Sequence, residues 1–121
     1  MRYTSIGAII SVAFFASTVS AEEIRVAFDD TATSYAAQEL STGDWSSAEA
    51  ALVGGEFSEE DQVFAKLNLA FVYSTTGRRD QAVAIYRDIL ADKENPYALL
   101  RNGEPRRVKT IAMTALNRLG E

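Results

Sequence analysis

The chain offers few residues that could carry out catalysis. It contains neither histidine nor cysteine, which removes thiolate nucleophiles, disulfides, the usual Cys/His zinc sites and histidine acid–base chemistry. Glu59, Glu60 and Asp61 could supply paired carboxylates, but adjacent residues at a helix start point to different faces, so we interpret them as charges that stabilise the helix dipole. Gly54 and Gly55 lack the further glycines and the lysine of a phosphate-binding loop. No serine lies in a nucleophile elbow, and the acids lack the spacing of a calcium loop. We therefore predict a protein that is not an enzyme, with no catalytic residue, cofactor or metal.

The first residues have the pattern of a secretory signal peptide. Arg2 precedes an apolar run from Ile6 to Ala16, and small residues at Val19 and Ala21 precede Glu22. This pattern predicts cleavage after Ala21. The alternatives are a membrane anchor or a buried helix, but the run is too short to span the roughly 30 Å hydrocarbon layer. We predict an exported protein with no stable membrane insertion after cleavage, periplasmic in a bacterium and otherwise secreted.

The charge of the mature chain is acidic and unevenly distributed. Without residues 1–21 the chain has 11 basic and 17 acidic residues, a net charge of −6, which argues against nucleic acid as a partner. Residues 22–61 hold eleven acids and a single base, Arg25, whereas residues 62–121 hold six acids and ten bases. Either the two halves pack with complementary fields, or one of them docks a charged partner.

Helix signals follow one another along the mature chain. A charged lead-in, residues 22–28, contains at most a short extended segment. Caps, glycine stops and apolar periodicity predict helices at about Thr31–Leu40, Trp45–Val53, Ser58–Thr75 with Ser58 as N-cap, Asp80–Leu90 and 105–119. Residues 95–104 are interpreted as one helical turn and a loop, and Pro105 as the first residue of the last helix.

The same residue types recur at an offset of 34 residues, which indicates an internal repeat. The pairs are Ala36 with Ala70, Gly43 with Gly77, Ala48 with Ala82, and Leu52 with Tyr86.

The second unit carries a longer pattern of small, aromatic and glycine residues: Asn68, Leu69, Ala70, Tyr73, Gly77, Ala82, Tyr86 and Leu90. The first unit carries part of it, at Ala36, Gly43, Asp44, Trp45 and Ala48. This pattern resembles the tetratricopeptide repeat (TPR) family over residues 29 to about 96. The first unit departs from it, because Glu39 stands where the family has an aromatic residue and Gly55 and Glu56 interrupt the second helix. Pro96 lies two residues past the usual proline.

The resemblance implies an all-α fold of antiparallel helical hairpins, stacked as a short right-handed TPR-like solenoid over residues 29–121. The repeats would be about 29–62 and 63–96, with a C-terminal capping helix at about 105–119. Because about three stacked repeats are normally needed to close a core, a capping helix or self-association should supply the remainder.

The resemblance also implies a function, that of a scaffold or interaction module whose concave face binds a protein or peptide partner. The residues it assigns to that face are Phe64, Leu67, Asn68, Phe71 and Ser74. Phe71 is expected to point into the concave groove, and Tyr73 toward the neighbouring hairpin. The alternative is that the last helix or the mature amino-terminal segment covers Phe64 and Phe71.

A different function is also compatible with the sequence. The protein could be a small structural homo-oligomer in which the acidic half of one copy pairs with the basic half of another. High salt should weaken that association, whereas it should not weaken an apolar contact in a groove.

Overall fold

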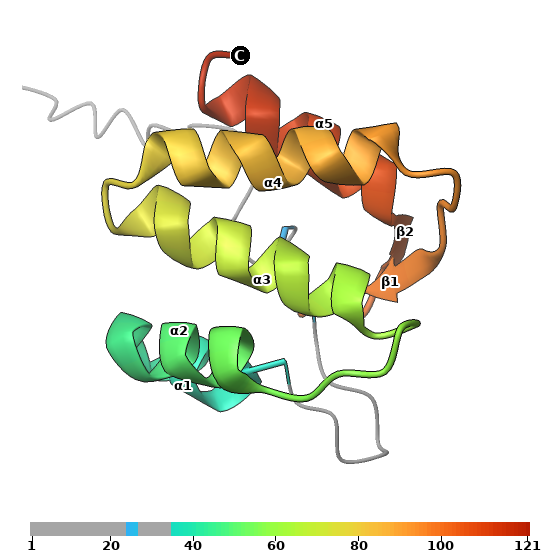
Figure 1. Ribbon diagram of the computed structural model, residues 1–121. Coiled ribbons are helices and arrows are strands. Elements are labelled where there is room, and N and C mark those ends of the chain that lie inside the picture. Colours follow the sequence, from blue (N-terminus) through green and yellow to red (C-terminus); the bar gives the residue numbers. More distant parts are fainter. Residues whose placement is uncertain (1–23, 27–34) are drawn as a thin grey trace, which may run out of the picture.

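The computed structural model describes residues 24–26 and 35–121. The predictions for the signal peptide and for the beginning of the first helix therefore lie outside the described residues. Within them the chain is mainly helical, with five helices that make up 60% of the described part and one two-stranded sheet. The elements follow in the order α1 (Ala37–Thr42), α2 (Trp45–Gly54), α3 (Gln62–Thr75), α4 (Arg79–Ala91), β1 (Tyr97–Leu99), β2 (Pro105–Arg107) and α5 (Val108–Arg118) (Figure 1).

Two helix-to-helix turns have the same backbone geometry at the predicted offset. Gly43 ends α1 with φ 73°, and Gly77 lies between α3 and α4 with φ 79°. In each turn the N–H after the glycine reaches back five residues: Asp44 donates to the Glu39 carbonyl at 2.9 Å, and Arg78 donates to the Tyr73 carbonyl at 2.8 Å. Such a bond typically accompanies a left-handed glycine that ends a helix. The two glycines are therefore required where each hairpin turns.

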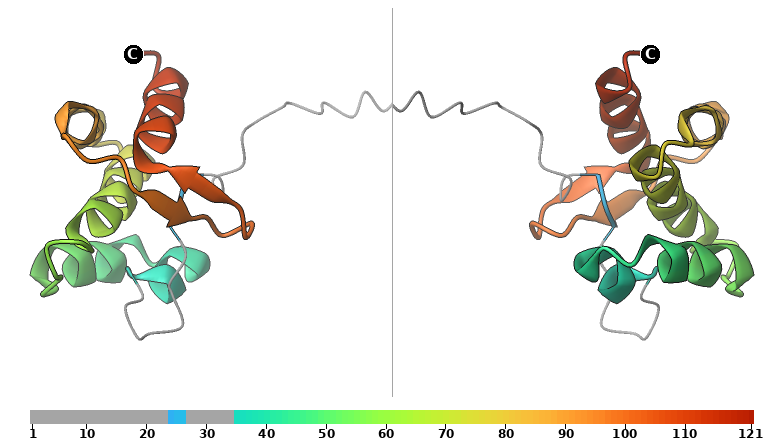
Figure 2. Two further views of the ribbon diagram at one scale, coloured as in Figure 1. Left: turned by 90° about the vertical axis from the view of Figure 1, so that its right-hand side faces the viewer. Right: turned by 90° about the vertical axis from the view of Figure 1, so that its left-hand side faces the viewer.

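The repeated small residues lie in the core. Ala48 in α2 and Ala82 in α4 are both fully buried, and so is Ala70 in α3. A methyl side chain at such a position lets two helices approach closely, while larger side chains such as Tyr86 fill the space between them. Figure 2 shows α2 and α4 on one side of α3, and α1, α5 and the sheet on the other.

The segment before the last helix differs from the prediction. Residues 95–104 do not form a helical turn: β1 pairs with β2 as an antiparallel hairpin in which Tyr97 faces Arg107 and Leu99 faces Pro105. Pro105 is thus a strand residue, and α5 begins three residues later than predicted, at Val108. The hairpin turn uses Gly103 at φ 82°. In β1 the central residue Ala98 is buried while Tyr97 and Leu99 are exposed, which is the alternation of a half-buried strand.

The first helix also differs from the prediction. It covers Ala37–Thr42 rather than ending at Leu40, and it enters from two residues with positive φ, Tyr35 at 41° and Ala36 at 60°. The predicted cap of α3 is confirmed only in part. The Ser58 hydroxyl donates to an Asp61 carboxylate oxygen at 2.8 Å, but these two residues form the turn that precedes the helix, and Asp61 is the N-cap.

Candidate functional site

The five residues assigned to a concave groove all lie on α3, and most of them are not open to solvent. Leu67 and Asn68 are 0% exposed and Phe71 is 7% exposed. Phe64 and Ser74 are half-buried, and the Ser74 hydroxyl donates to the Phe71 carbonyl at 2.7 Å. The expectation of an open Phe71 is therefore wrong: Phe71 is buried, whereas Tyr73 is only partly so.

A segment from the amino-terminal part of the chain covers this face. We call Ile24–Val26 the arm. Ile24 and Val26 are 4% and 3% exposed, and Val26 forms an isolated antiparallel bridge with Leu100 at the end of β1. Figure 2 shows the arm, coloured blue, on the side of α3 where the hairpin and α1 lie. Of the two alternatives left by the sequence, the structure thus supports cover by the amino-terminal segment.

Asn68 holds the arm by its backbone. Its Oδ1 accepts a hydrogen bond from the Val26 N–H at 2.8 Å, and its Nδ2 donates to the Val26 carbonyl at 3.1 Å and to the Tyr35 carbonyl at 2.9 Å. An amide that both accepts from and donates to one residue fixes the direction and position of that backbone. A fully buried asparagine without these partners would be costly, because each unpaired buried polar group costs about 1–3 kcal/mol.

The central side chain of the arm, Arg25, is anchored next to Asn68. Its guanidinium carbon lies 5.2 Å from the centre of the Phe71 ring, and its Nη1 donates to the Leu40 carbonyl in α1 at 3.0 Å. Phe71 in turn packs against Trp45 of α2, with ring centres 5.9 Å apart. We call the surface made by Leu40, Asn68, Phe71 and Leu100 the arm site. It binds main-chain groups, two apolar side chains and a cation over an aromatic ring.

Tyr35 lies just before α1 and has a strained backbone conformation, with φ 41°. Positive φ is a genuine outlier for a bulky residue, and Ala36 repeats it. The Tyr35 hydroxyl donates to Asp61 Oδ1 at 2.7 Å, and its ring lies 5.6 Å from that of Phe64 and 6.1 Å from that of Phe57. The hydrogen bond from Tyr35, followed by that from Ser58, lowers the pKa of the Asp61 carboxyl.

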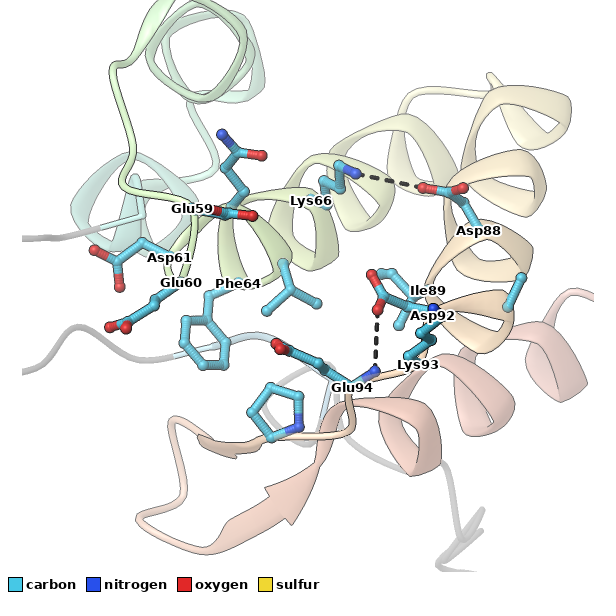
Figure 3. A pocket seen from close by; sticks show the side chains of 14 residues that line it. Glu59, Glu60, Asp61, Phe64, Lys66, Asp88, Ile89, Asp92, Lys93 and Glu94 are labelled. Carbon is cyan, nitrogen blue, oxygen red and sulfur yellow. Dashed lines mark hydrogen bonds and ion pairs between the residues drawn. The ribbon is translucent and has the colours of Figure 1, made fainter.

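A second concave feature lies between the start of α3 and the end of α4. This cleft has a volume of about 800 Å³ and carries acidic side chains from the turn before α3, from α4 and from the loop after α4 (Figure 3). They are Glu59, Glu60, Asp61, Asp88, Asp92 and Glu94, set against Lys66 and Lys93. Lys66 pairs with Asp88 at 3.3 Å, with both side chains largely exposed, so this pair contributes little to stability. Only Glu59, Glu60 and Asp61 are neighbours in the sequence, and the packing of α4 against α3 brings the other acids beside them.

The outer face of the hairpin is apolar and basic. Tyr97 is 59% exposed and Leu99 is 48% exposed. The Arg107 guanidinium lies 3.9 Å from the centre of the Tyr97 ring, and its Nη1 donates to the Asn95 carbonyl at 2.8 Å. Exposed Tyr97 and Leu99 beside this arginine form a surface that sequence reasoning missed, since it treated these residues as a helical turn.

An ion pair ties the two hairpin units together. Arg78, at the start of α4, donates from both terminal nitrogens to the Glu49 carboxylate of α2, at 2.5 and 2.8 Å. This hydrogen bonding lowers the pKa of Glu49. The guanidinium also lies over the Tyr73 ring, 4.6 Å from its centre. Tyr73 thus packs under a partly exposed ion pair at the edge of the two units.

Across residues 24–26 and 35–121, no group of three or more Asp, Glu, His or Cys side chains is placed to hold a metal ion. No helix in the same ranges is long and apolar enough to cross a membrane. Comparison with protein-family models, with curated proteins and with solved structures finds no match. The arm site and the acidic cleft are therefore interpreted from their own geometry.

Proposed function

We propose that this protein is an exported, TPR-like helical-repeat module that binds an extended segment of a protein partner at the arm site and catalyses no reaction. The observation that carries the proposal is the pair of hydrogen bonds between Asn68 and the backbone of Val26. Main-chain recognition of this kind, beside a strand edge, is how many modules bind extended peptides. In the isolated chain the arm is the occupant of that site.

Two features support the repeat architecture. The turns at Gly43 and Gly77 share one hydrogen-bonding pattern at the 34-residue offset, and the equivalent alanines Ala48 and Ala82 are both fully buried. In this proposal α1 to α4 form two stacked hairpins of a right-handed solenoid, and α5 caps them. Export rests on the signal-peptide pattern of residues 1–21, and intact mass of secreted material should show a chain that begins at Glu22.

A partner segment must compete with the tethered arm. A short tether presents its own segment at an effective concentration on the order of millimolar, so a free peptide binds the native chain weakly. Val26→Pro in the chain removes the N–H that donates to Asn68, because proline has no backbone donor. This variant should have a weakened arm and an accessible arm site.

The test uses a fluorescent peptide of residues 22–30, EEIRVAFDD, and the chain that begins at Glu22. We expect fluorescence anisotropy to show saturable binding that is at least tenfold tighter to the Val26→Pro chain than to the native chain. A peptide with its own Val26→Pro change should bind neither chain. Circular dichroism checks that the variant chain is folded. Equal or absent binding of the two peptides to the folded variant would refute the proposal.

A second candidate function is self-association through charge. The acidic cleft, to which Glu59 and Glu60 of the acidic half belong, could receive the basic hairpin of another copy, which carries Arg101, Arg106 and Arg107. Apart from the half-buried Arg106, these groups are exposed, so their attraction should fall as the Debye length shortens from about 10 Å at 0.1 M salt to about 3 Å at 1 M. Sedimentation at both salt concentrations tests it: oligomers that persist unchanged at 1 M would contradict the charge-based mechanism.

A further inference from the structure

The outer side of the β-hairpin is an exposed apolar surface. Alternation along the paired strands places Tyr97, Leu99, Pro105 and Arg107 on the side opposite to the buried Ala98. We call these four residues the hairpin face, and all four are exposed. Tyr97 and Leu99 are two of the four large apolar residues that are exposed in the described part of the chain. Single exposed apolar side chains are normal, but neighbouring ones on one surface indicate an interaction site.

Two arginines of the hairpin have no acidic partner among the described residues. Arg101 lies in the exposed turn, and the structure records neither a hydrogen bond nor an ion pair for its side chain. Arg107 lies over the Tyr97 ring, with its guanidinium carbon 3.9 Å from the ring centre, and its recorded hydrogen bond goes to the Asn95 carbonyl. A guanidinium held flat on an aromatic ring keeps further N–H groups available for a carboxylate. The hairpin face therefore suits a surface that is both apolar and acidic.

The acidic cleft has this complementary character. Glu59, Glu60 and Glu94 line it and are exposed, and within residues 24–26 and 35–121 no hydrogen bond or ion pair is recorded for their carboxylates. The half-buried Phe64 and Pro96 add apolar surface to its lining. Figure 3 shows Phe64 on α3 and Glu94 on the loop after α4, on either side of the cleft. The cleft thus offers free carboxylates beside apolar side chains.

The hairpin face and the acidic cleft lie next to each other at one end of the molecule. Pro96 lines the cleft, and the next residue, Tyr97, begins β1. Figure 1 shows the start of α3, the end of α4 and the hairpin together at this end. Two complementary surfaces that adjoin in this way match those of a second copy related by a two-fold axis between them. The charges at this end are therefore self-complementary.

We infer that this protein forms a two-fold symmetric dimer in which the hairpin face of each copy docks in the acidic cleft of the other. The inference rests on the second candidate function, self-association through charge, and it identifies the two surfaces that meet. Tyr97 and Leu99 pack against the apolar lining of the partner's cleft, and Arg101 and Arg107 face its free carboxylates. Tyrosine and arginine are the residue types that most often contribute strongly to binding at interfaces.

The symmetry sets the size of the expected effects. Each contact occurs twice in the dimer, so a change that weakens one contact by a given factor weakens dimerisation by the square of that factor. Truncation of a central aromatic side chain weakens an interface by at least about tenfold. Tyr97→Ala should therefore raise the dissociation constant of the dimer about a hundredfold, as measured by sedimentation equilibrium of the chain that begins at Glu22. The matched control is Met113→Ala, an exposed apolar residue on α5, which should leave the dimer unchanged.

A pair of charge reversals tests whether the two surfaces meet. One variant carries Arg101→Glu and Arg107→Glu and has an acidic hairpin, and the other carries Glu60→Lys and Glu94→Lys and has a basic cleft. Each alone places like charges opposite each other at both contacts and should be a monomer. Their mixture restores opposite charges at both contacts and should form a 1:1 heterodimer. Asp80→Lys, a reversal in the first turn of α4, is the control and should leave the native dimer unchanged.

The possible outcomes separate this inference from the function on which it rests. If the native chain forms a salt-sensitive dimer that Tyr97→Ala leaves intact, or if the folded charge variants do not combine, the docking of hairpin in cleft is wrong and self-association through charge stands. Oligomers that grow beyond the dimer with concentration would overturn the two-fold arrangement.

A native chain that stays a monomer up to about 1 mM would overturn both. Vesicles of anionic phospholipid that bind this monomer but not the Tyr97→Ala chain would then assign the hairpin face to a membrane surface instead of a second copy.

Discussion

Replacing Asn68 by alanine should release the arm while leaving the helical domain folded. The change removes the partners of three main-chain groups, the N–H and carbonyl of Val26 and the carbonyl of Tyr35. If these groups stayed buried and unpaired, each would cost about 1–3 kcal/mol. The arm can instead leave the surface, so the loss is limited to its net interaction. Three hydrogen bonds at a net value of about 1 kcal/mol each give a loss of about 3 kcal/mol in the free energy of unfolding.

The assay is urea unfolding followed by circular dichroism, with amide hydrogen exchange at Val26 as a local measurement. The matched control is Asn117→Ala, an exposed asparagine on α5. Both sites gain the better helix propensity of alanine, so the difference between the two variants isolates the contacts of Asn68. Protection of the Val26 amide should be lost in Asn68→Ala and kept in Asn117→Ala. If the two variants unfold within about 0.5 kcal/mol of each other, a value expected for surface changes, the reasoning about the arm is wrong.

Three further changes test other parts of the structure. Ala82→Leu places a larger side chain at a fully buried position and should lower the free energy of unfolding, measured by thermal unfolding, by about 1–3 kcal/mol. Ala84 is exposed on the same helix, so Ala84→Leu should be nearly neutral. Burial raises the pKa of Tyr86, whose hydroxyl has no hydrogen-bond partner among the described residues, so Tyr86→Phe should unfold at the same or a higher temperature, and a clear fall would reveal a partner for that hydroxyl. The hydrogen bond from Tyr35 lowers the pKa of Asp61 below its ordinary 3.8, so this carboxylate adds stability above that pH and loses it as the pH falls through the lowered value. The urea midpoints of native and Tyr35→Phe chains should therefore converge on acidification, and a constant gap would contradict this assignment.

The sequence predicted the repeated turns well because a local requirement determines them. Only a residue that tolerates positive φ can end α1 and α3 in this way, and a glycine in the sequence, as at Gly43 and Gly77, indicates such a turn. The burial of Ala48 and Ala82 followed from the same offset. Local signals of this kind do not depend on what packs against the hairpins.

The hairpin at 97–107 was missed although the sequence contains a signal for it. Asn102 and Gly103 form the dipeptide most typical of tight hairpin turns, between the apolar Tyr97–Leu100 run and the residues that precede α5. Pro105 was assigned to a helix start because proline favours that position. It also suits an edge strand, where its missing N–H faces away from the ladder. The pairing of Pro105 with Leu99 in β1 places it in a strand and not at a helix start.

The arm site was only half predictable. Asn68 was identified, but its partner Val26 lies 42 residues away, and no periodic pattern relates the two. The burial of Phe71 was left open for the same reason, since Arg25 and Trp45 contact it from separate parts of the chain. Long-range contacts of this kind depend on how the amino-terminal segment returns to the domain.

The most direct test of the account is to observe the contact between Asn68 and a separate peptide. An isotope-filtered nuclear Overhauser experiment would use the labelled Val26→Pro chain with an unlabelled peptide of residues 22–30. The account predicts cross-peaks between the side-chain amide of Asn68 in the chain and the Val26 protons of the peptide, since the two groups hydrogen-bond within one chain at 2.8 and 3.1 Å. A peptide whose cross-peaks fall only on residues outside the arm site would contradict it.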